Sequence, residues 1–437
     1  MTCRESDGQM YPAGGSLCRR EAAACHAGED GRRGSCSGRG GGGSHGLFSL
    51  FGPAPQRGVL LAVFVAYTAF GVLFQIFPPL LTAIAGQFHL SHGAAALVMV
   101  LFLVPILVMA LPAGLLVDRY GVRRVGWLAF ALLMLGAAMS VGAPTFALLL
   151  LGRVVSGCGG GLLVVDLLAL VTQCIAVEQR GLALGIFAAG LPVGTGVAFD
   201  LLAPLSGWWG WRGEMGIALL LVLAALLVFA RAVLWVAPGQ GSSAQLREVL
   251  RSGQLWRLAL VTMLGYTGIL GFTTWAPATL VAAARVPSWL GAVIASVLLV
   301  VDIPFAPFWG AVSDHAGRRK PFILLSFTLY FIGSLLVPLA AQAGPWRVPA
   351  LLIVVTEMGV GCAMFFPVAL TMPAEAVAAD QAGVAYGLFF LAQVAGMLVG
   401  PLIIGLVLDH GSAQMMFLTV SALTLAGLLA STRLQGR

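Results

Sequence analysis

The sequence predicts an all-α integral membrane protein in which twelve transmembrane helices form two pseudo-symmetric six-helix bundles. Of the 437 residues, 59% are hydrophobic and only 9% are charged, whereas soluble proteins carry about a quarter charged residues. The apolar runs are long enough for helices that cross a hydrocarbon layer of about 30 Å, and they lack the alternation typical of membrane β-barrels. Two short patterns in the first half also recur in the second half. Helices are predicted because lipid leaves few other ways to satisfy backbone hydrogen bonds.

Polar breaks divide the chain into twelve apolar runs, each of which predicts one spanning helix. The runs cover residues 58–84, 92–117, 124–143, 145–172, 181–205, 214–236, 257–283, 288–312, 321–341, 348–371, 382–407 and 413–431. The one long internal break, 237–256, follows the sixth run and contains the loop-forming sequence PGQGSSAQ. The sequence therefore predicts two halves, 58–236 and 257–431, joined by a cytoplasmic linker at 237–256 and followed by a short tail at 432–437.

Residues 1–57 have a different composition, rich in Gly, Arg, Ser and Cys, with the run GRGGGGSHG at 38–46. Such a segment cannot bury enough apolar surface to fold, so it predicts a disordered tail. The segment has no apolar core followed by a cleavage site of the signal-peptide kind. Cys3, Cys18, Cys25 and Cys36 match no zinc-site spacing, so we predict neither a metal nor a cofactor. A translation start further along the chain is the alternative interpretation.

Basic residues predict the orientation, because short loops rich in Lys and Arg stay in the cytoplasm. With both termini inside, three basic residues fall in outer loops: Arg212, Arg285 and Arg347. Thirteen fall in inner segments: Arg57, Arg119, Arg123, Arg124, Arg180, Arg247, Arg251, Arg257, Arg318, Arg319, Lys320, Arg433 and Arg437. We therefore predict a multi-pass protein of the plasma (cytoplasmic) membrane, the inner membrane of a bacterial cell, with both termini cytoplasmic.

Two patterns recur in the same order in the two halves. GLLVDRYGVRR at 114–124 returns as GAVSDHAGRRK at 310–320, and EQRGLALGIF at 178–187 returns as DQAGVAYGLF at 380–389. Parallel repeats of this kind relate two halves by an axis along the membrane normal and place a solute site between them, near the bilayer midplane.

These repeats resemble the loop signature GxLaDRxGrkx of the major facilitator superfamily. The first copy is matched by Gly114, Leu116, Asp118, Arg119, Gly121 and Arg123, with Val122 departing. The second copy is matched by Gly310, Asp314, Gly317, Arg318 and Arg319, with Val312 and His315 departing. The fourth run, LLGRVVSGCGGG at 150–161, also matches the arginine and glycine pattern of that family. The resemblance covers residues 58–432.

The resemblance implies a secondary active transporter that moves a small solute by alternating access, here predicted to be proton-coupled; symport, antiport and uniport stay open. GLPVGTGVAFD at 190–200 lacks the Gly-Pro pair typical of the antiporters in this family, so a drug/proton antiporter is the alternative. A channel or a membrane sensor on the same fold is the alternative from another class. The chain has no GxxxxGK[ST] loop and no catalytic cluster, so we predict neither a primary pump nor an enzyme. Substrate identity and direction of transport stay open.

Ionisable side chains inside the spans are candidate transport residues, since each costs from about 3 to more than 10 kcal/mol at mid-bilayer. Arg153 and Glu357 are predicted at similar depth on paired spans. Arg153 could hold an anionic group of the solute and Glu357 could carry the coupling proton, or the two could form a static ion pair. Asp302, about 18 Å from the inner end at 1.5 Å per residue and close to Pro304, is either a protonation switch or a carboxylate bonded to a neighbouring helix.

Three further aspartates have predicted gate roles. Asp200, near the outer surface, is a gate or coupling residue, and Asp166, near the inner end of the fourth span, is predicted to pair with the arginines at 119–124. Asp118 and its repeat Asp314 are predicted latches that bond basic residues or a neighbouring helix N-terminus. The predicted partners are the lipid bilayer, a small solute and a co-transported proton, with no nucleic acid and a monomeric state.

Overall fold

The computed structural model describes residues 54–90, 92–202, 206–234, 236, 246–377 and 381–434, and these residues form helices and short connections with no strand among them. Most of the predicted tail, with its four cysteines, lies outside the described residues, as does the stretch 237–245 of the predicted linker.

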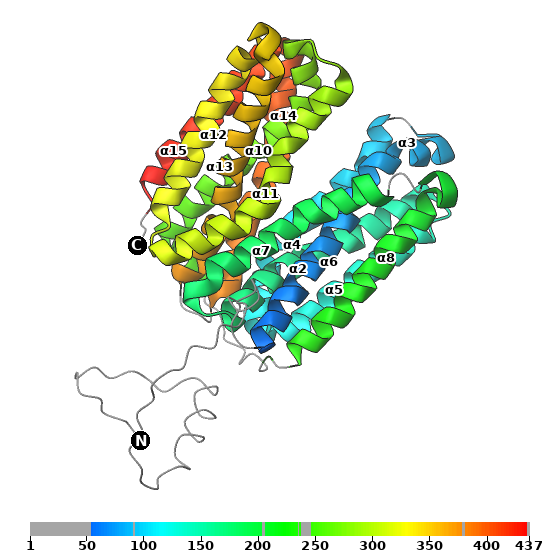
Figure 1. Cartoon of the computed structure of the whole chain (residues 1–437). Helices are drawn as coiled ribbons and strands as arrows, with labels where there is room; N and C mark the ends of the chain where they lie inside the picture. The colour runs from blue at the N-terminus through cyan, green and yellow to red at the C-terminus, as the bar shows by residue number, and fades with distance from the viewer. Residues whose placement is uncertain are drawn as a thin grey trace, which may run out of the picture. The chain divides into compact units, whose positions relative to one another are not determined.

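The first half contains helices α2 to α8 (Figure 1). Their bounds are α2 Ala54–Gln75, α3 Phe77–Phe88, α4 His92–Tyr120, α5 Val122–Val141, α6 Phe146–Cys174, α7 Arg180–Gly196 and α8 Ser206–Val233. Helices α2 and α3 together form the first predicted span. The 17-residue α7 continues as a π-helical segment, η3, at Val197–Leu202, and the two together form the fifth span.

The second half contains helices α9 to α15. Their bounds are α9 Leu246–Arg251, α10 Gly253–Ala284, α11 Ser288–Ala316, α12 Lys320–Ala341, α13 Arg347–Glu375, α14 Ala382–His410 and α15 Ala413–Thr432. Each predicted span thus has a helical counterpart, and the twelve-helix, two-bundle fold class is confirmed. Eleven described helices are individually long and apolar enough to cross a membrane; the shorter α7 is the span that this criterion omits. The short helix α9 lies in the predicted linker.

The break between α2 and α3 follows directly from the sequence. Pro78 and Pro79 have no backbone N–H, so they cannot continue the hydrogen-bond ladder of α2. Ile76 still donates its N–H to the carbonyl of Val72 at 2.9 Å, and Phe77 then begins α3. The prolines leave the carbonyls of Phe74 and Gln75 without a helical donor, and the carbonyl of Leu73, at the same interruption, accepts from Arg153 instead.

The surface of the bundles suits lipid rather than water. Large apolar side chains such as Val108, Leu339 and Ile353 are more than 60% exposed. Inside the first half, glycines let helices approach closely: a Cβ added to Gly152 of α6 would lie 2.7 Å from the carbonyl oxygen of Gly136 of α5. Close backbone packing of this small-residue kind is how spanning helices associate without a hydrophobic driving force.

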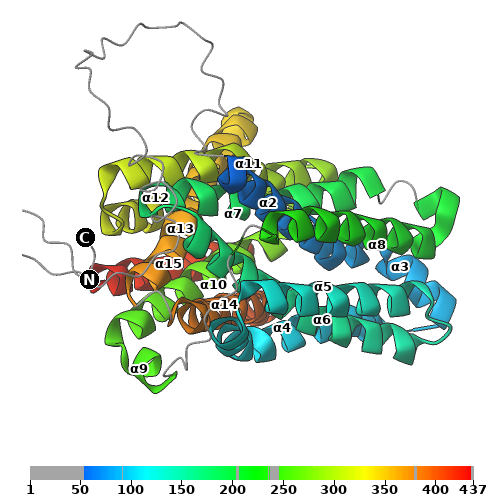
Figure 2. The ribbon, with the colours of Figure 1, turned by 90° about the horizontal axis from the view of Figure 1, so that it is seen from below.

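The two halves contact each other through four helices. Helix α4 packs against α14, and α7 packs against α11 and α13; Figure 2 shows α4 beside α14 and α7 beside α11. The closest approaches lie where the repeated sequences occur. A Cβ on Gly114 would lie 2.8 Å from the Cα of Val384, and one on Gly310 would lie 3.1 Å from the backbone nitrogen of Leu182. The repeats therefore lie at the contact between the halves.

Candidate functional site

Asp118, in the last turn of α4, caps a helix of the opposite half. Its Oδ1 accepts a hydrogen bond from the N–H of Gly383 at 2.8 Å, and its Oδ2 accepts one from the N–H of Val384 at 2.9 Å. Both amides belong to the first turn of α14, where N–H groups lack intrahelical acceptors and the helix dipole is positive. The carboxylate thus joins the two halves by charge-assisted hydrogen bonds.

Asp314 makes the same arrangement in the reverse direction. Near the end of α11, its Oδ1 accepts from the N–H of Gly181 at 3.0 Å and its Oδ2 accepts from the N–H of Leu182 at 2.9 Å. These amides begin α7 of the first half. We predicted that Asp118 and Asp314 bond either basic residues or a neighbouring helix N-terminus. In the structure both carboxylates bond a helix N-terminus. We call the Asp118 and Asp314 caps the first and second latch.

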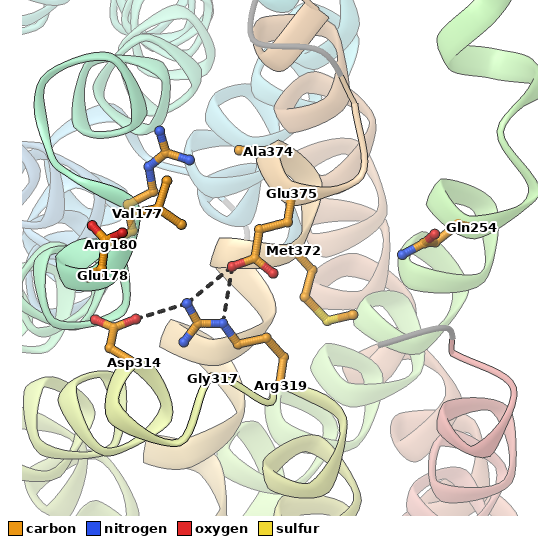
Figure 3. Close-up of a pocket in the computed structure, with 10 residues that line it drawn as sticks. All are labelled: Val177, Glu178, Arg180, Gln254, Asp314, Gly317, Arg319, Met372, Ala374 and Glu375. Atoms are coloured by element: carbon orange, nitrogen blue, oxygen red, sulfur yellow. Dashed lines mark hydrogen bonds and ion pairs between the residues drawn. The ribbon is translucent and has the colours of Figure 1, made fainter. Parts of the chain in front are cut away.

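The second latch has an ion network in addition. The Arg319 Nη2 lies 2.9 Å from the Asp314 Oδ1 and 3.1 Å from the Glu375 Oε1, and its Nη1 donates to the Ser313 Oγ at 2.7 Å. Figure 3 shows Arg319 between the two carboxylates. In the first half the counterpart of Arg319 is Arg123, which is exposed and has no ion pair with the described residues. Arg319 thus joins the second latch to the end of α13.

The remaining signature residues shape the turns. Gly121 and Gly317 have positive φ angles of 79° and 61°, a backbone conformation that glycine adopts without a Cβ penalty. Arg119 is exposed, with its guanidinium 5.4 Å from the ring centroid of Tyr120, and Arg318 is also exposed. These arginines do not bond the latches; they provide the positive charge that predicted a cytoplasmic loop.

A charged cavity of about 770 Å³ lies beside the second latch. Its lining residues are Val177, Glu178, Arg180, Gln254, Asp314, Gly317, Arg319, Met372, Ala374 and Glu375, shown in Figure 3. Arg180 lies at the start of α7 and donates to the carbonyls of Thr172 at 2.7 Å and Ile175 at 3.3 Å. The cavity is thus lined by both halves at the end of the molecule where the latches lie.

Gly114→Val is expected to reduce solute transport at least about tenfold, because overpacking a tight contact costs about 1–3 kcal/mol. The added side chain would meet the backbone of Gly383 and Val384 and keep the first latch from closing. Transport in reconstituted vesicles measures the effect. Gly86→Val in α3 is the matched control, since a Cβ there meets nothing within 4 Å; an equal loss in both variants would contradict the explanation.

Arg153 is fully buried inside the first half. Its Nη1 donates to the carbonyl of Leu73 at 3.0 Å, in the last turn of α2, and its Nε donates to the carbonyl of Val98 at 3.0 Å. The guanidinium carbon lies 4.1 Å from the ring centroid of Phe77 and 4.0 Å from that of Phe102, a double cation–π contact. Its Nη2 has no hydrogen-bond partner among the described residues.

Glu357, on α13, is half-buried and forms no ion pair with Arg153. The alternative of a static Arg153–Glu357 pair is therefore wrong for this structure. The reason is the rotation of α6 about its own axis. Arg153 points toward α2, α3 and α4 of its own half, where it donates to two carbonyl groups and packs against two aromatic rings. Similar depth on paired helices does not bring two side chains together.

Asp302 is 8% exposed on α11, and its Oδ1 has no hydrogen-bond partner among the described residues. Two prolines, Pro304 and Pro307, follow it within the helix. Tyr67 on α2 and Tyr266 on α10 lie within electrostatic range of its carboxyl group. Asp302 is therefore a buried carboxyl group between the halves, with phenol groups of both halves close by.

The two tyrosines were not among the residues predicted from the sequence. A repeat identifies them in retrospect, since Tyr67 begins YTAFG at 67–71 and Tyr266 begins YTGILG at 266–271. Their backbones are packed alike: Gly190 of α7 contacts Tyr67, and Gly396 of α14 contacts Tyr266. Pseudo-symmetry thus places one phenol from each half near Asp302.

A small cavity of about 20 Å³ lies next to Tyr67. Its lining residues are Tyr67, Phe70, Phe74, Leu103, Ile106, Leu191, Phe390, Gln393, Val394 and Met397. They come from α2, α4 and α7 of the first half and α14 of the second. Tyr67 and Gln393 are the polar side chains of its lining.

Asp166 does not pair with the arginines at 119–124, so that prediction is wrong. The side chain is fully buried, and neither carboxylate oxygen has a hydrogen-bond partner among the described residues. It faces α5 and α8 instead: a Cβ on Gly126 would lie 2.8 Å from the Asp166 Oδ2, beside the ring of Phe229. Arg123 and Arg124 are exposed. Asp200 lies in the π-helical segment η3, and its gate role stays a prediction.

Comparison with known proteins agrees with this architecture. The model of the Major Facilitator Superfamily matches residues 59–301 and 279–435. The "Efflux pump terG" of Aspergillus terreus is 30% identical over 26% of this chain and 23% of its own length. The "Nitrite extrusion protein" of Bacillus subtilis is 25% identical over 61% of this chain and 71% of its own.

Among solved structures, the human organic anion transporter MFSD10 (TETRAN) superposes with a TM-score of 0.69 at 18% identity, covering 87% of this chain and 100% of that chain. This likeness concerns the fold alone. The family match extends over nearly all of the described helices, and the repeated signatures lie at the contact between the two bundles. The chain belongs to the Major Facilitator Superfamily.

Proposed function

We propose that the chain is a proton-coupled secondary transporter that moves a small solute by alternating access. The observation that carries this proposal is the reciprocal pair of latches, in which each half caps a helix of the other. Superfamily membership makes the chain a multi-pass transport protein and not an enzyme. Symport at the plasma membrane is the proposed mode, and drug/proton antiport, favoured by the efflux relative, is the second candidate.

The latches suit a reversible gate. A hydrogen bond to a charged group contributes about 1.5–3 kcal/mol, so four of them can hold the contact closed without making it permanent. We place this gate on the cytoplasmic side, because the signature arginines at 119–124 and 318–320 surround it. The described structure then corresponds to a transporter closed toward the cytoplasm.

Asp302 is the proposed proton carrier. A buried carboxyl group with an unpartnered oxygen changes its interactions strongly when it gains or loses a proton. The prolines that follow it in α11 remove backbone hydrogen bonds and make bending easier at this position. Proton binding at Asp302 and bending of α11, which also carries the second latch, would thereby be coupled through one helix. Glu357 and Asp200 are proposed to assist as proton and outer-gate residues, whereas Arg153, enclosed by two carbonyl groups and two aromatic rings, is proposed to hold the helices of the first half together.

Transport by the purified full-length protein in proteoliposomes tests the proposal. Under an imposed pH gradient we expect saturable accumulation of at least one member of a panel of organic acids, sugars, amphiphilic drugs and inorganic anions, and we expect an uncoupler to abolish it. Binding without translocation would identify a sensor instead, and current that does not saturate would identify a channel. Accumulation unaffected by the uncoupler would remove proton coupling from the proposal.

Glu357→Gln is expected to reduce proton-driven transport about threefold to tenfold, less than a change at Asp302. Glu357 is half-buried on α13 and forms no ion pair with the described residues, so water can replace part of its role. Initial rates at two external pH values measure the effect. A variant that transports normally at both pH values would exclude Glu357 from proton coupling.

Arg153→Gln is expected to lower the unfolding temperature by about 5 °C or more. The change removes charge-assisted hydrogen bonds and two ring contacts, together about 3 kcal/mol, and 1 kcal/mol corresponds to roughly 2–4 °C in a large domain. Thermal unfolding in detergent measures it. Arg153→Lys keeps the charge but cannot bond both carbonyls in the same geometry, so its unfolding temperature should lie between those of the unaltered protein and Arg153→Gln. Unchanged unfolding temperatures in both variants would contradict a stabilising role.

A further inference from the structure

The short helix α9 of the linker is docked on the second half. It has six residues, and an isolated helix of this length is not stable in water. Val249 of α9 is nevertheless only 1% exposed, and α9 packs against α10 and α14. Contact with these two helices therefore holds α9 in its place.

Two hydrogen bonds join the end of α9 to the start of α10. The indole Nε1 of Trp256 donates to the carbonyl of Leu250 at 2.8 Å, and the N–H of Ser252 donates to the carbonyl of Val249 at 3.1 Å. Both carbonyls belong to the last turn of α9, where helix carbonyls lack intrahelical donors. Helix α9 is thus bonded to α10 as well as packed against it.

The side chain of Val249 belongs to an apolar cluster that is separate from the main core, and we call it the linker cluster. Its other buried members are Leu255 and Ala259 of α10 and Val384, Ala385, Leu388 and Ala392 of α14. Leu111 and Leu115 of α4 pack against this cluster from the first half. The linker cluster therefore brings the linker helix together with helices of both halves.

The linker cluster and the first latch share Val384. The side chain of Val384 lies in the cluster, while its N–H donates to the Asp118 Oδ2 at 2.9 Å. When the first latch opens and α4 leaves α14, Leu111 and Leu115 leave the cluster and expose its apolar surface. The docked state of α9 and the closed state of the latch therefore stabilise each other.

We propose that α9 is a strap on the inner gate: docked in the linker cluster it favours the closed first latch, and its release favours opening. The strap rests on the proposed function only for the opening of the gate. Because coupling between two sites is reciprocal, opening of the first latch also loosens α9. Anything that pulls the linker from the cluster thereby opens the transporter toward the cytoplasm.

Val249→Thr tests the strap, with amide hydrogen exchange of the purified full-length protein as the measurement. Threonine has nearly the shape of valine but places a hydroxyl group among apolar side chains, so α9 should be released. We expect the Gly383 and Val384 amides to exchange at least about fivefold faster, because exchange follows the population of locally open molecules. Val177→Thr is the matched control and should leave their exchange unaltered, since Val177 is 50% exposed beside the second latch.

Two further variants complete the test. Trp256→Phe keeps a ring but removes the bond to the Leu250 carbonyl, so it should accelerate exchange of the same amides to a smaller extent. Asp118→Asn should accelerate exchange of the Ser252 amide if the coupling is reciprocal. Thermal unfolding of each variant separates release of α9 from loss of the fold, and Trp256→Phe carries the test if Val249→Thr does not fold.

The outcomes separate the strap from the transport function. Unaltered exchange of the Gly383 and Val384 amides in Val249→Thr, or equal acceleration in Val177→Thr, would overturn the strap. If that exchange is unaltered while Asp118→Asn still impairs cycling in proteoliposomes, the gate stands and the strap fails. If exchange is faster as expected while Val249→Thr and Asp118→Asn both transport like the unaltered protein, the strap stands and the latches are not a transport gate.

Discussion

Asp302→Asn is expected to slow proton-driven transport by about 100-fold or more, the range seen when a group that transfers a proton is removed. Asparagine has nearly the same shape but cannot bind or release a proton near neutral pH. The rest of the site, with Tyr67 and Tyr266 close by, should keep its geometry. Initial rates of uptake under an imposed pH gradient in proteoliposomes measure the effect, and solute exchange at saturating concentration without a gradient should be reduced far less.

Asp409→Asn is the control, because it removes a carboxylate that is exposed at the end of α14. Asp302→Glu should recover part of the gradient-driven rate, since it restores a titratable group one methylene further from the helix. Fully gradient-driven transport in Asp302→Asn would show that another group carries the proton.

The second large effect is expected at the second latch. Asp314→Asn removes the charge from two backbone hydrogen bonds and from the ion pair with Arg319. With about 1.5–3 kcal/mol for each bond to a charged group, a net loss of about 3 kcal/mol would lower the ratio of closed to open molecules roughly 150-fold. Arg319 keeps Glu375 as a partner, so the fold should survive.

Pulsed electron paramagnetic resonance between spin labels at positions 124 and 316 measures this change, because both positions are exposed and belong to different halves. We expect the distance distribution to move to longer values in Asp314→Asn. Asp118→Asn should also move it and should impair cycling more than solute binding. An unaltered distribution, or a large loss of affinity with a normal cycling rate, would count against the latches.

The sequence predicted the twelve spans well because bilayer thickness sets helix length and polar residues interrupt the runs. It also predicted the position of the latches, since Asp118 and Asp314 occupy the same place in a repeated signature. The rotation of α6 about its axis could not be predicted in the same way. The residues of α6 are apolar or glycine on every face of the helix. The sequence pattern therefore does not indicate that Asp166 faces α5 and α8 or that Arg153 faces α2 and α4.

Glu375 shows a second reason for a missed residue. It is the last residue of α13 and lies just beyond the predicted apolar run 348–371, so the run gives no reason to place it in the spanning helix. Only the fold shows that the end of α13 lies beside the turn after α11, where Arg319 forms an ion pair with Glu375. Contacts between segments that are distant in sequence depend on helix packing, which local hydrophobicity does not encode.

The Arg319 ion network has a consequence for the path of the conformational change. Arg319 bonds Asp314 of α11 and Glu375 of α13, and α7 packs against both of these helices. The inner ends of α11 and α13 should therefore move away from α7 together, as one rigid edge, when the inner side opens.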